Sequence, residues 1–85
     1  MDCNKALRQA DELGSLSNTL MDERVRLESL LARIKNEWCG PASSEFQLRL
    51  QKLIEDVDLA RCHLLDVAYT IVQIVRDAQT DTTFA

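Results

Sequence analysis

The stretch Glu37-Trp38-Cys39-Gly40-Pro41-Ala42-Ser43-Ser44-Glu45-Phe46 decides the fold of this 85-residue chain and contains its only tryptophan and its only proline. Glycine is favoured where a helix ends with positive φ, and proline suits the first position of the next helix, which needs no backbone N–H. The following Ser43-Ser44-Glu45 offers oxygens and negative charge to the free N–H groups of a new first turn. The stretch therefore predicts a tight turn between two helices.

The predicted architecture is all-α, with one helical-hairpin domain over residues 1–85. We expect the first helix over about residues 5–39, the turn over about 39–43, the second helix over about 43–79 and a flexible tail over 80–85. A connection of this length forces the two helices to lie antiparallel.

The first helix carries an apolar pattern of the coiled-coil kind. One series recurs every seven residues and a second is offset from it by four: Ala6, Leu13, Leu20, Leu27 and Ile34, and then Ala10, Ser17, Arg24, Leu31 and Trp38. The pattern weakens at Ser17 and Arg24. Gly14 costs about 1 kcal/mol of helix propensity relative to alanine, which makes its neighbourhood the softest part of this helix.

The second helix has a continuous apolar stripe with alternating steps of four and three: Phe46, Leu50, Leu53, Val57, Ala60, Leu64, Val67, Ile71, Ile74 and Ala78. A second, patchier stripe lies beside it: Ile54, Leu65, Ala68, Val72 and Val75. One antiparallel helix covers one stripe, so the other needs a further surface. We therefore expect a dimer, either homomeric or heteromeric, that forms a four-helix bundle.

The residues expected to bind the partner are the apolar members of both helices away from the ends. They are Leu20, Leu27, Leu31, Ile34, Leu50, Leu53, Ile54, Val57, Leu64, Leu65, Val67, Ala68, Ile71, Val72, Ile74 and Val75.

Composition and motifs argue against several other classes of protein. The net charge of −4 and pI of about 4.8 disfavour nucleic-acid binding. No apolar run reaches the length of a membrane span, and no signal-peptide pattern follows Met1, so we expect synthesis in the cytoplasm. The lone His63 and the unpaired spacing of Cys3, Cys39 and Cys62 predict no catalytic site, no metal site, no cofactor and no intrachain disulfide. Free thiols are expected, with an intermolecular bridge as the alternative.

The turn also carries an extended motif, W-x-G-x-A-x-x-x-F, formed by Trp38, Gly40, Ala42 and Phe46. With a helical segment on each side in a chain of this length, it resembles the WXG family of small proteins of type VII (ESX) secretion systems in Gram-positive bacteria and actinobacteria. The resemblance implies a helical hairpin that pairs with itself or with a related small helical protein. It also implies export without a cleaved signal peptide, or service as a targeting partner for a larger effector such as an LXG toxin, with the secretion ATPase as a further partner.

One position departs from the family pattern. Members often carry Y-x-x-x-D/E near the end of the second helix as an export signal, whereas here Tyr69 is followed by Gln73. This degenerate signal favours a chain that depends on the signal of its partner. The alternative function is a cytosolic adaptor or chaperone-like subunit that covers an apolar helix of another protein.

Overall fold

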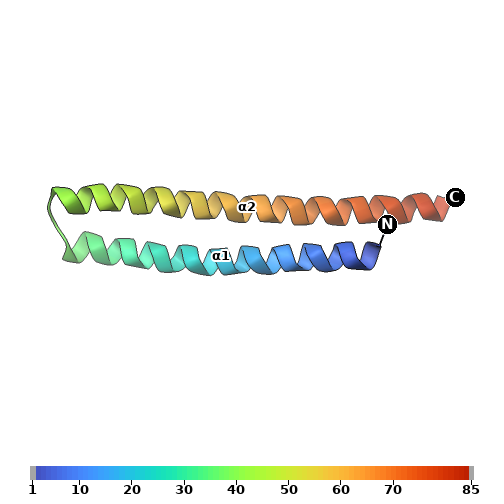
Figure 1. Cartoon of the computed structure of the whole chain (residues 1–85), viewed down its shortest axis with the longest axis horizontal. Coiled ribbons are helices and arrows are strands. Elements are labelled where there is room, and N and C mark those ends of the chain that lie inside the picture. Colours follow the sequence, from blue (N-terminus) through green and yellow to red (C-terminus); the bar gives the residue numbers. More distant parts are fainter. Residues whose placement is uncertain (1, 85) are drawn as a thin grey trace.

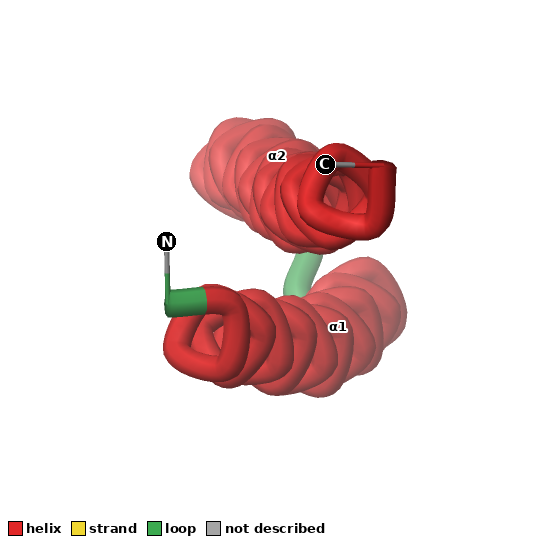
Figure 2. The backbone as a smooth tube through the Cα atoms, turned by 90° about the vertical axis from the view of Figure 1, so that its right-hand side faces the viewer, coloured by secondary structure: helices red, strands yellow, loops and turns green. Residues whose placement is uncertain are grey.

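The protein is a hairpin of two long helices. The computed structural model describes the backbone of residues 2–84 and the burial of side chains in residues 2–80. Helix α1 spans Cys3–Glu37 and helix α2 spans Pro41–Phe84. They lie antiparallel and side by side, with both chain ends at the end of the rod opposite the turn (Figure 1). The rod measures 68 × 15 × 13 Å, and the view along it shows the helices inclined to one another, as in a coiled coil (Figure 2).

The helix ends differ from the predicted bounds. Helix α1 begins two residues earlier because Asp2 caps it, with its carboxylate accepting the Lys5 N–H at 3.0 Å. It ends at Glu37, and Trp38 is the extended cap residue whose N–H still bonds to the Ile34 carbonyl at 2.9 Å. Helix α2 continues to Phe84, beyond the predicted bound near residue 79; Ala85, the last residue of the predicted tail, lies outside the described residues.

The turn forms largely as its residue types predict. Gly40 has φ of 118°, a left-handed conformation that residues with a Cβ rarely adopt, and it is the one positive-φ residue in the described backbone. Pro41 is the first residue of α2, where its missing N–H costs nothing. The role predicted for Ser43 is corrected: its hydroxyl donates to the Trp38 carbonyl at 2.8 Å and accepts from Gln47 at 3.1 Å. Ser43 is 1% exposed and links the end of α1 to the start of α2.

The core is a narrow seam between the two helices. On α1, the buried and half-buried residues of the seam follow the predicted heptads: Ala6, Ala10, Leu13, Ser17, Leu20, Arg24, Leu27, Leu31 and Ile34. On α2 the seam consists of Ser43, Gln47, Leu50, Ile54, Val57, Arg61, Leu64, Ala68, Ile71, Val75 and Ala78. Ala10, Leu50 and Val75 are the buried apolar residues among those described, so most of the seam remains partly open to solvent.

Replacing Gly14 with alanine is expected to stabilise the hairpin. Gly14 lies inside α1, has an ordinary helical φ, and a Cβ there would meet no atom within 4 Å. The gain in helix propensity is about 1 kcal/mol. Urea unfolding followed by circular dichroism should therefore give a higher midpoint for Gly14→Ala. An unchanged or lower midpoint would contradict the expected gain in helix propensity.

Candidate partner-binding surface

The long apolar stripe predicted on the second helix is divided by the packing of α1. Alternate members, namely Leu50, Val57, Leu64, Ile71 and Ala78, lie in the seam. The members between them, namely Phe46, Leu53, Ala60, Val67 and Ile74, lie outside it and are exposed. The seam takes its other half from residues that include Ile54, Ala68 and Val75 of the second predicted stripe. The stripe that the sequence presents as one unit therefore serves two different surfaces.

The exposed half of the stripe runs along α2 from the turn almost to the open end. Four of its side chains are large and about half exposed: Phe46 at 42%, Leu53 at 47%, Val67 at 50% and Ile74 at 49%. They recur every seven residues, so they stay on one side of the helix along its length. The fifth member, Ala60, stands at the middle of the row.

Helix α1 contributes Leu16 and Leu30 to the same side. Their exposed fractions are 53% and 39%. Leu16 directly precedes the seam residue Ser17, and Leu30 directly precedes the seam residue Leu31. Each residue of the α2 row likewise directly precedes a seam residue. In an antiparallel pair of helices, the residues that directly precede the seam residues of each helix lie on the same side of the pair. We call Leu16 and Leu30 together with the α2 row Phe46, Leu53, Ala60, Val67 and Ile74 the apolar face.

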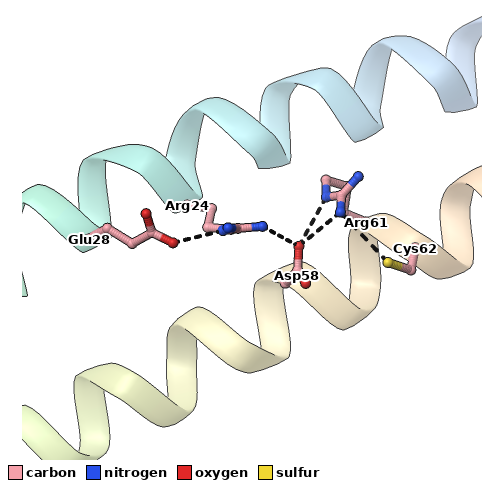
Figure 3. Close-up of polar contacts among 5 residues, drawn as sticks. All are labelled: Arg24, Glu28, Asp58, Arg61 and Cys62. Atoms are coloured by element: carbon pink, nitrogen blue, oxygen red, sulfur yellow. Dashed lines mark hydrogen bonds and ion pairs between the residues drawn. The ribbon is translucent and has the colours of Figure 1, made fainter.

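The opposite side of the rod carries an ion-pair network at mid-length, shown in Figure 3. The Arg24 guanidinium lies between Glu28 of its own helix and Asp58 of α2, at 2.8 Å from each carboxylate. Arg61 also donates to Asp58, at 3.0 Å. The spacing of four residues allows Arg24 and Glu28 to pair within one helix, whereas the link to Asp58 requires the tertiary register. Arg24 therefore satisfies its charge at a position where the heptad pattern expects an apolar residue.

The ion-pair network changes the pKa values of Asp58 and Arg24. Hydrogen bonds from Arg61 and then from Arg24 hold the pKa of the Asp58 carboxyl below its ordinary value of 3.8. Hydrogen bonds to Glu28 and then to Asp58 raise the pKa of Arg24, which stays charged in any case. Both ends of the bridge between the helices are thus ionised at neutral pH.

The stability of the hairpin is expected to fall at acid pH in part through Asp58. Because the pKa of Asp58 is lower in the folded chain than in the unfolded one, its contribution is complete above about pH 4 and is lost as pH falls through the folded value. Denaturation midpoints of the native chain and of Asp58→Asn should differ at pH 7 and converge as the pH falls below about 4. A difference that does not change with pH would contradict this role for the carboxylate.

A shallow groove lies toward the open end, on the same side as the network. Its volume is about 540 Å³, and its apolar lining comes mainly from α2, with Ala10 from α1. The predicted partner-binding residues Leu65, Ala68 and Val72 line it. Tyr69, of the degenerate export signal, stands at its edge with 66% of its surface exposed, while Gln73 is half-buried.

The turn motif gathers at one tip of the rod. The rings of Trp38 and Phe46 lie with centroids 5.8 Å apart and are inclined by 49°. With Ala42, Glu45 and Arg49 they line a hollow of about 270 Å³. Trp38 remains 45% exposed, so its ring lies on the tip rather than inside the seam. The positive φ of Gly40 sets the backbone conformation of the turn at this tip.

Apart from Leu65 and Val72 of the groove, the predicted partner-binding residues fall into two groups. Those in the seam are Leu20, Leu27, Leu31, Ile34, Leu50, Ile54, Val57, Leu64, Ala68, Ile71 and Val75. Those on the apolar face are Leu53, Val67 and Ile74. Leu16 and Leu30 of the apolar face are not among the residues that the sequence predicted to bind the partner. Their separation of fourteen residues, which is two heptads, is the signal that identifies them as one row.

The other side chains with reactive chemistry are His63 and the three cysteines. His63 is exposed, and the thiols of Cys3, Cys39 and Cys62 are free. Among the described residues, no group of three or more His, Cys, Asp or Glu side chains is placed to hold a metal ion. Neither α1 nor α2, as far as the structure describes them, combines the length and hydropathy of a membrane-crossing helix.

Comparison of the chain with protein-family models finds no matching family, and comparisons with curated proteins and with solved structures find no match. The fold and the surface define it at the level of a class: an elongated antiparallel two-helix hairpin with an apolar face that α1 and α2 leave uncovered.

Proposed function

We propose that this chain is a non-catalytic, helix-pairing protein that uses its apolar face to form a four-helix bundle with a second helical hairpin. The observation that carries the proposal is the uncovered apolar row on α2, with Leu16 and Leu30 beside it. A half-exposed large side chain gains about 1 kcal/mol when the remainder of its surface leaves water. A row of such side chains therefore favours association.

The division of the long stripe supports a bundle in particular. A helix in a four-helix bundle contacts two neighbours, so it needs one apolar row for each of them. On α2, the seam row that includes Leu50 and Leu64 meets α1. The adjacent row, from Phe46 to Ile74, is then the surface for the second neighbour. Both rows together form the uninterrupted pattern seen in the sequence.

We further propose that the pairing serves type VII secretion, either through export of the chain or through targeting of a larger effector such as an LXG toxin. The support is the W-x-G-x-A-x-x-x-F motif at the tip of a hairpin, where Trp38 and Phe46 lie in ring contact. The absence of an acid at Gln73 supports reliance on a partner for the export signal. A cytosolic adaptor role is the alternative, and export distinguishes the two.

The test is an export assay in a host with an active type VII system. The tagged chain is expressed alone, with a related small hairpin protein, and with an LXG effector, and culture supernatants are compared with those of a strain whose secretion ATPase is inactive. We expect the chain or its effector in the supernatant only when the ATPase is active. Retention of both in every combination would overturn the secretion role and leave the adaptor role.

A further inference from the structure

We propose that the groove toward the open end is a second binding site, which takes one short amphipathic helix with basic flanks from a separate protein chain. The groove lies on the side of the rod that carries the ion-pair network, opposite the apolar face. It therefore stays open when the apolar face is covered. The site is separate from the proposed pairing, and its occupancy does not depend on that pairing.

The groove exists because the two helices contribute side chains of unequal size there. Helix α1 supplies the small Ala10, and one turn later Gly14 has no side chain; a Cβ at Gly14 would meet no atom within 4 Å. Helix α2 supplies the larger Leu65, Tyr69 and Val72. Leu65 is 43% exposed and Tyr69 is 66% exposed, so this apolar wall stands open to solvent. A partner that covers the wall removes apolar surface from water, which favours binding.

The length of the groove suits a short helix rather than a second hairpin. Its lining on α2 extends from Leu65 to Arg76, which is eleven residues or about 16 Å along the axis. The apolar row on the other side extends from Phe46 to Ile74, which is twenty-eight residues or about 42 Å. An occupant that matches the groove has about three helical turns, with apolar residues spaced by three and four.

The backbone around the groove also favours a helical occupant over an extended one. The walls belong to the interiors of α1 and α2, where the backbone N–H and C=O groups bond within each helix. An extended segment needs partners for its own backbone groups, and walls of this kind offer it none. A helix satisfies those groups internally and presents only its side chains to the apolar lining.

The charged residues of the groove decide the charge of the occupant. Asp11 lines it from α1 and Asp66 lines it from α2, and both are exposed. Neither carboxylate has an ion-pair partner in the described part of the chain. A helix in the groove therefore has a carboxylate beside each flank, which favours lysine or arginine at its flanking positions. Arg76 lines the end nearest the chain termini, where it favours an acidic residue of the occupant.

Two synthetic peptides of about 18 residues, long enough to form a helix, test this charge preference. Both carry the same leucine stripe, and the flanking positions are lysine in one peptide and glutamate in the other. Fluorescence anisotropy of the labelled peptides measures their binding to the full chain. We expect the lysine peptide to bind at least about 10-fold more tightly, with a preference that shrinks as salt is added. Equal binding of the two peptides would overturn the charge assigned to the occupant.

Exchanging the charges of the groove should reverse the preference. The double variant Asp11→Lys, Asp66→Lys should bind the glutamate peptide more tightly than the lysine peptide, and circular dichroism checks that it stays folded. The matched control is Glu12→Lys, Asp77→Lys, which makes the same change in net charge at two exposed acids that do not line the groove. The control should keep the preference for the lysine peptide. An equal reversal in both variants would show that net charge, and not the groove, selects the peptide.

A second pair of variants separates the groove from the apolar face. Leu65→Ala, Tyr69→Ala removes the open wall and should weaken the lysine peptide about 10-fold or more, while pairing, followed by light scattering, stays unchanged. Leu53→Asp, Val67→Asp should do the opposite. Loss of the peptide only in the second variant would place it on the apolar face and overturn the second site, leaving the pairing proposal intact. Altered self-association in the first variant would make a second copy the occupant and overturn the separate chain.

Discussion

The double variant Leu53→Asp, Val67→Asp is expected to be a folded, helical monomer at concentrations where the native chain is expected to pair. Both side chains lie on the apolar face and about half of each is exposed, so the hairpin itself tolerates the carboxylates. Pairing would bury them without partners, which costs several kcal/mol. The expected effect is at least about a 100-fold weaker association, measured by light scattering with circular dichroism as the check on folding.

Leu59→Asp is the control for that result. Leu59 is a large apolar residue on the same helix with 59% exposure, and it lies on neither the seam nor the apolar face. This variant should pair like the native chain. If the double variant also pairs normally, the apolar face is not the site of association. If both variants dissociate, added negative charge on α2 is the cause.

Val75→Asp is expected to unfold the hairpin itself rather than act only on the proposed pairing. Val75 is 2% exposed and lies in the seam near the open end, where it packs beneath α1. A carboxylate there has no partner and loses its water, so we expect a loss of roughly 3 kcal/mol or more in the free energy of unfolding. Chemical denaturation at several protein concentrations measures this loss and separates it from any change in pairing.

Leu48→Asp is the matched control for the seam, since Leu48 is 70% exposed on the same helix. It should unfold close to the native midpoint. Equal destabilisation by Val75→Asp and Leu48→Asp would mean that the seam contributes little to stability. An aspartate at Leu64 or Ile71 would likewise affect folding before any pairing, because both residues lie in the seam.

In the turn, some features follow from the local sequence alone and others depend on the folded chain. Gly40 takes the positive φ that its position demands, and Pro41 opens α2, because these choices depend on the backbone of one residue. The role of Ser43 was not predictable in the same way. Its hydroxyl has several backbone groups within reach, and the carbonyl of Trp38 becomes available only when the chain has turned. The cap on α1 supplied by Asp2 is local, yet it was missed because residues near a chain end give little periodic signal.

The helix ends were less predictable than the helices. Periodicity of apolar residues identifies the interior of α2 but is absent after Ala78, so the continuation to Phe84 had no sequence signal of that kind. Helix α1 ends at Glu37, although its apolar series runs on to Trp38. Trp38 is the residue that follows the helix, and its indole lies against Phe46.

The sequence by itself determined that this protein is two antiparallel helices joined at Gly40 and Pro41, because heptad spacing and turn chemistry are properties of neighbouring residues. It also determined that α2 has more apolar surface than one helix covers. Only the tertiary structure decided which half of that surface remains uncovered. The choice depends on how α1 is rotated and in what register it lies, and these are set jointly by the seam, the Arg24–Asp58 bridge and the Ser43 link at the turn. Position in the sequence does not distinguish Val67 from Leu64; packing against α1 does.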